Sequence, residues 1–369
     1  MLGLQKKKKE RYIESWYNLR PLLGNSNWAL FYILIASRQT GKGFSVQDYC
    51  LSQWKKNPDN YLTWIRLREE HAKELLKNNA QKLFEPILVR RYGLNLRTRG
   101  TEVYHVEEEK YIDKNGNEQN RITKKIKIAE VYGASTYYKT KGQTLMDAEW
   151  FKDPTHFKNI VIDECVAEPG EPEFDRANAL VNLLETMCRN QKDQIKIFML
   201  GNNVIDANSS DVITSCFNFF PEEFGIYKLK NKRAVIHNVA PTLEYEQMRK
   251  GSIANLLLPN SSTFTNRRNE DKALIDKSPL RKPMYVIKFD LSSDTWFTVW
   301  NNNIIKRYNK EQVRVIPMRP YIGEVYTTEA VSDIMLQFDA RSYHYRDLIT
   351  FKLFQHQLKC VKPRGTKRS

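Results

Sequence analysis

The stretch Ser37-Arg38-Gln39-Thr40-Gly41-Lys42-Gly43 directly follows an apolar run, residues 28–36, with the sequence WALFYILIA. An apolar strand that leads into a short loop ending in Gly-Lys is typical of a phosphate-binding loop. In such a loop the backbone N–H groups surround the phosphates, and the next helix points its N-terminus at them. The usual pattern has glycine five positions before Gly41 and serine or threonine after Lys42, where this chain has Ala36 and Gly43. The motif therefore predicts nucleotide binding through residues 37–43, but it needs independent support.

That support comes from a second apolar run that ends in two acids, residues 159–164 with the sequence NIVIDE. Such a run predicts a buried parallel strand whose C-terminal edge carries the carboxylates of Asp163 and Glu164. Open α/β sheets bind their ligands at this edge. In a nucleoside triphosphatase the aspartate holds Mg²⁺ and the glutamate polarises the attacking water. The two motifs in this order predict a P-loop ATPase of the type with an added catalytic glutamate.

The pattern along the chain predicts an α/β protein with more than one domain, as its 369 residues also suggest. Strands expected at 61–67, 159–162 and 195–200 alternate with helices expected at 44–56, 69–84 and 176–190, which favours a mostly parallel sheet. Short strands with Ser- and Asn-rich turns follow at 284–289, 295–300 and 304–308, and a helix at 343–358. We therefore expect an ATPase domain at 1–240, a helical linker at 241–278 and a C-terminal α+β domain at 279–369.

Composition restricts the partners. The net charge is +16, which favours a polyanion such as DNA or RNA, although charge alone does not choose among polyanions. No apolar run approaches the roughly 20 residues that span a bilayer, so we expect no membrane partner. The five cysteines lack paired or metal-like spacing and read as free thiols in a reducing cytoplasm.

Residues 97–129 differ from the alternating pattern around them. Their centre contains Asn115-Gly116 between strand-like, highly charged arms, which predicts a β-hairpin. We interpret it as a surface ribbon, and contact with DNA, contact with a neighbouring subunit and a simple solvated excursion remain open.

The order of these motifs resembles that of phage genome-packaging ATPases. The resemblance rests on residues 37–42, Lys141-Gly142, residues 160–164, the sequence MCRN at 187–190 and the sequence LGNN at 200–203. It is strongest to the DNA-encapsidation ATPases of small, short-tailed phages with protein-primed linear genomes, which are related to large-terminase motors. It covers essentially the whole chain. The fold that it implies is an N-terminal ATPase domain, a small linker and a C-terminal RNase H-like domain that has lost nuclease activity.

The resemblance also implies roles for single residues. Lys42 would bind the β- and γ-phosphates, Asp163 the Mg²⁺ that accompanies ATP, and Glu164 would activate water. Arg189 would be the arginine finger that reaches the ATP of a neighbour, and Asn202 the sensor of the γ-phosphate. Lys141 is a weaker match to a basic residue at the subunit boundary. Arg38 ranks below Arg189 as a finger.

Two departures from the family pattern concern the metal and the loop. Gly43 lacks the hydroxyl that normally binds Mg²⁺, so Thr40, Ser45 or water must replace it. We take Ser45, with Asp163, as the predicted metal-binding residues. Ala36 replaces the first glycine, which the loop tolerates if this residue keeps strand geometry.

The partners that the resemblance implies are double-stranded DNA, the portal of an empty procapsid and further copies of the chain in a ring, usually a pentamer. In some relatives a ring of phage-encoded structural RNA lies between motor and portal. The location implied is the host cytoplasm, with transient attachment to the procapsid and absence from the mature virion.

Alternative functions remain open at this stage. One is a large terminase with an active nuclease, in which Asp290 would be one of several metal-binding acids. Others are a DNA-binding protein with a decayed ATPase site and a ring-forming helicase. The further acids of the C-terminal domain show no metal-site pattern and read as solvated groups: Asp294, Glu324, Asp333, Asp339 and Asp347. Basic residues there are the expected contacts to DNA, portal or RNA: Arg281, Lys282, Lys306, Arg307 and the tail from Lys359.

Overall fold

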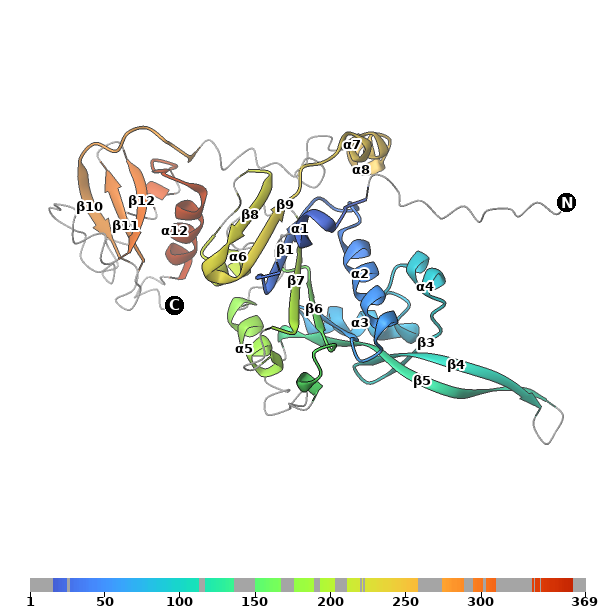
Figure 1. The fold of residues 1–369 in the computed structure, drawn as a ribbon. Coiled ribbons are helices and arrows are strands. Elements are labelled where there is room, and N and C mark those ends of the chain that lie inside the picture. Colours follow the sequence, from blue (N-terminus) through green and yellow to red (C-terminus); the bar gives the residue numbers. More distant parts are fainter. Residues whose placement is uncertain are drawn as a thin grey trace, which may run out of the picture. The chain divides into compact units, whose positions relative to one another are not determined.

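The chain forms two compact units in this computed structural model (Figure 1). Unit 1 comprises Met1–Asn203 and Glu223–Asn266, and unit 2 comprises Val204–Glu222 and Arg267–Ser369. This division differs from the expected one in two places. Unit 1 includes much of the stretch expected as a linker, up to Asn266. Residues 204–222, expected in the ATPase domain, belong to unit 2. The structure describes residues 16–24, 27–112, 117–135, 150–166, 176–188, 193–202, 211–219, 221, 223–257, 274–288, 295–300, 303–309, 334, 336–338 and 340–360.

Unit 1 is built on a nine-stranded sheet with the order β3-β4-β5-β2-β6-β7-β1-β9-β8. Its central pairs, from β5 through β2, β6, β7 and β1 to β9, are all parallel, and antiparallel pairs lie at both ends. The predicted mostly parallel sheet is therefore confirmed. The strands are β1 Phe31–Ile35, β2 Leu62–Arg66, β3 Leu96–Arg99, β4 Glu102–Ile112, β5 Glu118–Gly133, β6 Lys158–Asp163, β7 Ile195–Gly201, β8 Gly225–Leu229 and β9 Ala234–Asn238.

The four apolar runs that predicted parallel strands all form central strands, because a strand covered on both faces needs apolar side chains throughout. The first begins at Phe31, three residues later than expected. The sequence interpretation missed β8 and β9. These strands are short, and β8 alternates between half-buried and exposed positions, as an edge strand does.

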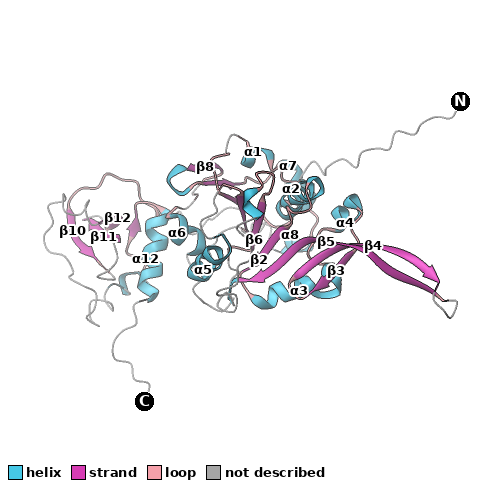
Figure 2. Cartoon of the chain, turned by 60° about the horizontal axis from the view of Figure 1, so that its bottom comes forward, coloured by secondary structure: helices cyan, strands magenta, loops and turns pink. Residues whose placement is uncertain are grey.

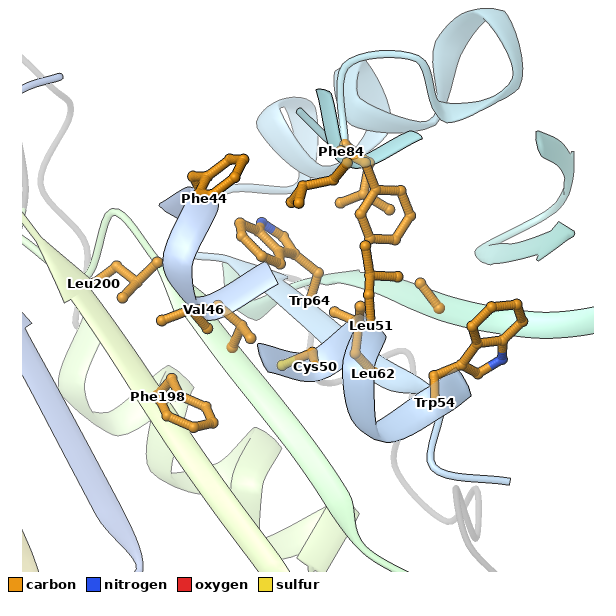
Figure 3. Packing of buried hydrophobic residues seen from close by; sticks show 14 of the residues in the cluster. Phe44, Val46, Cys50, Leu51, Trp54, Leu62, Trp64, Phe84, Phe198 and Leu200 are labelled. Carbon is orange, nitrogen blue, oxygen red and sulfur yellow. The ribbon is translucent and has the colours of Figure 1, made fainter. Parts of the chain in front are cut away.

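Helix α2, Lys42–Lys56, packs its apolar side on one face of the sheet (Figure 3). Its residues Val46, Cys50 and Leu51 are fully buried, and they lie beside Trp64 of β2 and Phe198 of β7. This packing holds the start of α2 at the carboxyl end of β1. The other helices of unit 1 are α1 Arg20–Leu23, α3 Glu69–Ala80, α4 Pro86–Tyr92, α5 Arg176–Cys188, α7 Leu243–Arg249 and α8 Ile253–Leu257.

The helix expected over residues 69–84 ends earlier, which corrects that prediction. Lys77 has an extended backbone, and Asn78 and Asn79 have the left-handed φ values of 51° and 56°. Asparagine tolerates this conformation better than most residues do, because its short side chain can hydrogen-bond locally. The chain then continues into α4, which begins with Pro86 and ends at Gly93 in the left-handed conformation.

The predicted hairpin is confirmed: β4 and β5 pair in antiparallel fashion from Glu102↔Glu130 out to Ile112↔Glu118. The Asn115-Gly116 turn lies outside the described residues. Figure 1 shows that the ribbon formed by β4 and β5 projects from the rest of unit 1.

Unit 2 contains a four-stranded sheet with the order β10-β11-β12-β13 and the helices α6, Asp211–Phe217, and α12, Leu348–Cys360. The strands are β10 Pro283–Ile287, β11 Thr295–Trp300, β12 Ile304–Asn309 and β13 His344–Tyr345. The first three are antiparallel, which confirms the predicted meander, and β13 is parallel to β12. Helix α12 begins five residues later than expected, because Asp347 accepts the N–H of Thr350 at 2.7 Å and so caps the first turn.

Among the described residues, no helix is long and apolar enough to cross a membrane.

Candidate nucleotide-binding site

The loop between β1 and α2 has the backbone shape that its sequence predicted. The N–H of Ala36 donates to the carbonyl of Gly201 on β7 at 3.2 Å, so this residue continues strand-like pairing, as required where the usual glycine is missing. Gly41 precedes the first helical residue with a left-handed φ of 76°. A Cβ atom on Gly41 would lie 2.7 Å from Cγ of Trp16, so both conformation and space require glycine there.

Lys42 is the first residue of α2 and turns its amino group back over the loop. Its Nζ donates to the carbonyl oxygens of Ala36 and Ser37, at 3.4 and 3.3 Å, and to Oδ1 of Asn202 at 2.7 Å. Burial lowers the pKa of Lys42 to about 8, against the opposing influence of Asp163. The structure thus brings together Lys42 and Asn202, which sequence reasoning had assigned separately to phosphate binding and phosphate sensing.

The two predicted acids lie where β6 ends. Asp163 is the last residue of the strand, and Glu164 follows it with a left-handed φ of 57°. The N–H of Glu164 donates to Oδ1 of Asp163 at 3.0 Å. Burial raises the pKa of Asp163, although Arg66 and Lys42 act in the opposite direction. A non-glycine residue with positive φ at this point is backbone strain of the kind that collects at functional sites.

Arg66 is a site residue that sequence reasoning missed. It ends β2, in register with Asp163 on the neighbouring strand β6. Its Nη2 lies 2.8 Å from Oδ2 of Asp163, and its Nη1 forms an ion pair with Oε2 of Glu164. One guanidinium therefore holds both carboxylates. The sequence predicted that Arg66 lies near the end of a strand. It could not predict that Asp163 lies opposite on the neighbouring strand.

The hydroxyl groups near the loop are engaged with backbone. Thr40 Oγ1 donates to the carbonyl of Ser37 at 2.9 Å. Ser45, a predicted metal-binding residue, is buried and donates its hydroxyl to the carbonyl of Tyr17. Space around Gly43 is open, since a Cβ atom there would meet no heavy atom within 4 Å. The chemistry of the oxygen donors that remain, chiefly the Asp163 carboxylate, fits Mg²⁺, which binds through one or two carboxylates plus phosphates and water.

Helix α7 contacts the loop from the stretch expected as a linker. The hydroxyl of Tyr245, a side chain only 1% exposed, donates to the carbonyl of Arg38 at 2.7 Å. Arg249 Nη1 donates to the side-chain oxygen of Gln39, a residue with a left-handed φ of 64°. The candidate nucleotide-binding site therefore includes a helix that the sequence pattern had placed in a separate segment.

The segment before β1 also packs on the loop. The Trp16 ring contacts the Phe44 ring edge-on, with centroids 4.3 Å apart. Tyr17 is buried, and its hydroxyl is hydrogen-bonded to Nδ1 of His237 at 2.8 Å. Two predicted site residues, Lys141 and Arg189, lie outside the described residues, and their roles stay predictions.

The carboxyl edge of the sheet at β1, β2, β6 and β7 carries one lysine, one arginine and two carboxylates. Lys42 and the loop N–H groups can bind phosphate oxygens, and the carboxylate pair can hold a divalent cation and accept a proton from water. Among the described residues there is no cluster of three or more His, Cys, Asp or Glu side chains that would hold a metal by itself. Mg²⁺ held by these carboxylates would take its other ligands from water or from substrate phosphates.

Comparison with solved structures identifies the fold. The Phi-28 gp11 DNA packaging motor superposes with a TM-score of 0.58 at 14% identity, covering 95% of this chain and 99% of that one. The bacteriophage Phi-29 viral genome packaging motor assembly gives the same TM-score and identity, covering 94% of this chain and 99% of the other. The large terminase of a thermophilic bacteriophage matches with a TM-score of 0.38 at 10% identity, covering 94% and 79%. Neither a protein-family model nor a curated protein matches the sequence. The chain has the fold of phage packaging-motor subunits along nearly its whole length.

Proposed function

We propose that this chain is the ATP-hydrolysing subunit of a motor that moves double-stranded DNA into an empty viral procapsid. The observation that carries the proposal is the convergence of Lys42, Asp163 and Glu164 at the carboxyl edge of the sheet, where β1 and β6 lie on either side of β7. The fold shared with packaging-motor chains supports the choice of DNA packaging among the many functions of P-loop ATPases.

In the proposed reaction, Lys42 and the N–H groups of residues 37–43 bind the phosphates of ATP. Asp163 would hold Mg²⁺, which would supply positive charge to neutralise the phosphates. Glu164 accepts a proton from the attacking water. Arg66 pairs with Oε2 of Glu164, and release of that ion pair would free this oxygen to accept the proton. Lys42 likewise must leave Asn202 for the phosphates, after which the Asn202 side chain can contact the γ-phosphate.

Further parts of the proposal concern assembly. The subunits would form a ring, most simply a pentamer, in which Arg189 reaches the ATP of a neighbour and Lys141 acts at the same boundary. Arg189 would stabilise the charge that develops in the transition state. The ring would dock on the portal, with or without an intervening RNA ring, in the host cytoplasm, and would leave before the virion matures. The Phi-29 chain that shares this fold belongs to a viral genome packaging motor assembly, which supports an oligomeric machine.

For unit 2 we propose an RNase H-like domain without nuclease activity that contacts DNA, portal or RNA. Asp290 lies outside the described residues, and Asp347 is engaged in capping α12. Basic side chains of the described part, Arg281, Lys282, Lys306 and Arg307, supply positive charge for such contacts.

The test is ATP hydrolysis by the full chain with Mg²⁺, with and without long double-stranded DNA. We expect turnover that DNA stimulates, and the Glu164→Gln variant should lose it by roughly 10²- to 10⁴-fold. DNA binding without turnover, even after procapsids are added, would contradict the motor and favour a decayed site. Metal-dependent DNA cleavage lost in Asp290→Ala would instead indicate a terminase with a live nuclease, and strand separation on forked DNA a helicase.

A further inference from the structure

Unit 1 contains a cavity of about 490 Å³ that the candidate nucleotide-binding site does not use. It lies between the end of α3, helix α4 and strand β3, and its lining residues all fall within 79–97. Figures 1 and 2 show these three elements near the part of the β4–β5 ribbon where β3 pairs with β4. Ligand cavities of proteins have volumes of roughly 300–1,000 Å³, so this one is large enough for a small organic molecule.

The inner wall of this cavity is apolar and fixed by the fold. Leu94 and Leu96 are buried, each 8% exposed, and Val89 is half-buried. The N–H of Leu94 donates to the carbonyl of Val89 at 2.9 Å, which joins two of these residues. All three pack in or against the hydrophobic core of unit 1. A wall of this kind suits the flat or apolar body of a ligand, because covering it removes apolar surface from water.

The mouth of the cavity carries positive charge. Asn79, Gln81 and Arg90 line it with exposed side chains, and none of the described lining residues is Asp or Glu. Arg97 also lines the cavity, but its guanidinium is paired with Glu108 at 2.6 Å. Within the part of the chain that the structure describes, the Arg90 side chain has neither an ion pair nor a hydrogen bond. The cavity therefore offers one uncompensated guanidinium, which favours an anionic ligand.

The backbone at the mouth is strained. Asn78, Asn79 and Ala80 have left-handed φ values of 51°, 56° and 56°. Asparagine tolerates this region, but Ala80 has no polar side chain that could hydrogen-bond locally, so its conformation is unfavourable. Strained backbone persists only where the surrounding structure imposes it, and it collects at ligand-binding sites. Here the strained bend places Asn79 at the cavity.

The side chains at the mouth indicate which kind of anion fits. The amides of Asn79 and Gln81 each provide a donor and an acceptor, and neither amide is hydrogen-bonded to another described residue. The edges of nucleobases present both kinds of group, and Asn and Gln recognise them through paired hydrogen bonds. The guanidinium of Arg90 matches the geometry of a phosphate. An aliphatic anion would use the apolar wall and Arg90 but would leave the two amides without a role.

We propose that this cavity binds a nucleotide, with the base against the apolar inner wall, the edge of the base at the two amides and the phosphate at Arg90. The site is separate from the phosphate loop at Lys42, because the two share no lining residue. The inference does not depend on the motor function. The ligand is a free nucleotide or an unpaired nucleotide of a strand, since both present the same base and phosphate.

The test is calorimetric titration of the full chain, saturated with ADP and Mg²⁺, with the monophosphates of adenosine, guanosine, cytidine and uridine in turn. ADP occupies the phosphate loop, so a monophosphate that still binds uses another site. We expect at least one of them to bind. Arg90→Gln should weaken its binding at least tenfold, because a charge-assisted hydrogen bond is lost. Arg99→Gln is the matched control, an exposed arginine of β3 outside the cavity, and should change the affinity less than twofold.

A second variant tests recognition of the base. Asn79→Gly keeps the left-handed backbone and removes the amide, so it should weaken binding at least threefold. Unchanged affinity in this variant would mean that only the charge is recognised and would overturn the proposal. It would also be overturned if no monophosphate binds at millimolar concentration, if ADP displaces the bound monophosphate, or if the two arginine variants have equal effects.

A short single-stranded oligonucleotide distinguishes the two sources of the ligand. Binding tighter than that of the monophosphate, and equally sensitive to Arg90→Gln, supports the site with a strand as its source. Weaker binding supports the site with the free nucleotide as its source. The result is also independent of the proposed function. If the chain fails to bind ADP, the proposed function fails, and the two arginine variants still decide whether this cavity binds a nucleotide.

Discussion

Strand β6 begins with Lys158 and ends with Asp163, and the charged side chains at its two ends have different surroundings. At its carboxyl end, Asp163 and the following Glu164 share Arg66, and Lys42 lies nearby with the replaceable partner Asn202. At its amino end, Lys158 is 1% exposed and lies 3.6 Å from Glu130 of β5. Both ends have a lysine near carboxylates, which is fully buried at the amino end and half-buried at the carboxyl end. The carboxyl end alone carries the N–H groups of a phosphate-binding loop, with open space beside Gly43.

The amino end is a sealed network. The Lys158 ammonium lies 3.4 Å from the centre of the Tyr61 ring, and Lys127 pairs with both Glu130 and Glu102. Burial lowers the pKa of Lys158 to about 7, against the attraction of Glu130. At the carboxyl end the same physical cause lowers the pKa of Lys42, but there an incoming phosphate can reverse it. The difference is that the charged groups at the amino end have only protein partners, whereas Lys42 at the carboxyl end can exchange a protein partner for a phosphate.

The largest effect on stability is expected from removing a charge at the amino end of β6. Glu130→Gln removes the carboxylate beside Lys158 and one partner of Lys127, and we expect the free energy of unfolding to fall by about 3–5 kcal/mol in urea titration. Lys158→Met leaves Glu130 paired with Lys127, so it should be neutral or stabilising. Similar losses in both variants would contradict this description of the network. Turnover per folded molecule should be unchanged in Lys158→Met.

The sealed lysine should also make stability depend on pH. Its pKa is about 7 in the folded chain and about 10.4 when unfolded, so between these values the unfolded chain binds a proton that the folded chain lacks. Stability should therefore rise with pH across this window, at most by about 1.4 kcal/mol per pH unit, and the cost of burial should be constant below pH 7. Unfolding curves at several pH values measure the slope. Lys158→Met should lack this contribution, and a slope unchanged in that variant would refute it.

At the open end, Lys42 should make ATP binding depend on pH. Phosphates bind the protonated amine, and the pKa of Lys42 is about 8 in the free chain. Above pH 8 binding must take up a proton, so the dissociation constant for ATP should rise by up to about tenfold per pH unit. Arginine stays protonated throughout this range. Lys42→Arg should therefore bind more weakly at pH 7 but without that slope, and parallel curves for the two proteins would exclude Lys42 as the titrating group.

Substitution of Arg66 should have a smaller effect, on the pH dependence of ATP hydrolysis at the carboxyl end of β6. Arg66 lowers the pKa of Asp163, which burial raises. In Arg66→Gln the carboxylate should protonate at higher pH, so the acidic limb of the ATPase pH profile should move up by about one pH unit. Arg97→Gln is a matched control, because Arg97 also pairs with a glutamate, Glu108, but does so away from the site. An acidic limb that stays in place would show that Arg66 does not tune Asp163.

The smallest effect concerns Gly43. The space around it is open, so Gly43→Ser can add the missing hydroxyl without a clash. We expect a few-fold lower Mg²⁺ concentration for half-maximal turnover, because a direct oxygen ligand replaces water. Gly43→Ala provides the control for a simple gain in helix propensity, about 0.5–1 kcal/mol. Equal Mg²⁺ dependence in both variants would mean that the hydroxyl does not reach the metal.

The sequence by itself determined the local elements and the chemical character of the site. Apolar runs such as 159–162 identify buried strands because only side chains that avoid water tolerate burial on both faces. Glycines in the loop and acids at the end of an apolar strand mark the edge of the sheet where ligands bind. Lys42, Asp163 and Glu164 could therefore be identified from the sequence alone. The hairpin signal at Asn115-Gly116 was equally local, because a tight turn needs residues that accept positive φ.

Only the tertiary structure decided which of these elements are neighbours. Arg66 reaches both acids because β2 lies beside β6, and Tyr245 reaches the phosphate loop because α7 folds back across some 200 residues of chain. Strand order in a parallel sheet depends on how the connections pack, which local pattern does not encode. The partners of Ser45, Lys158 and Asn202 were hidden for the same reason. The chemistry of a side chain determines what it can bind, but only the fold determines which groups lie close enough to bind it.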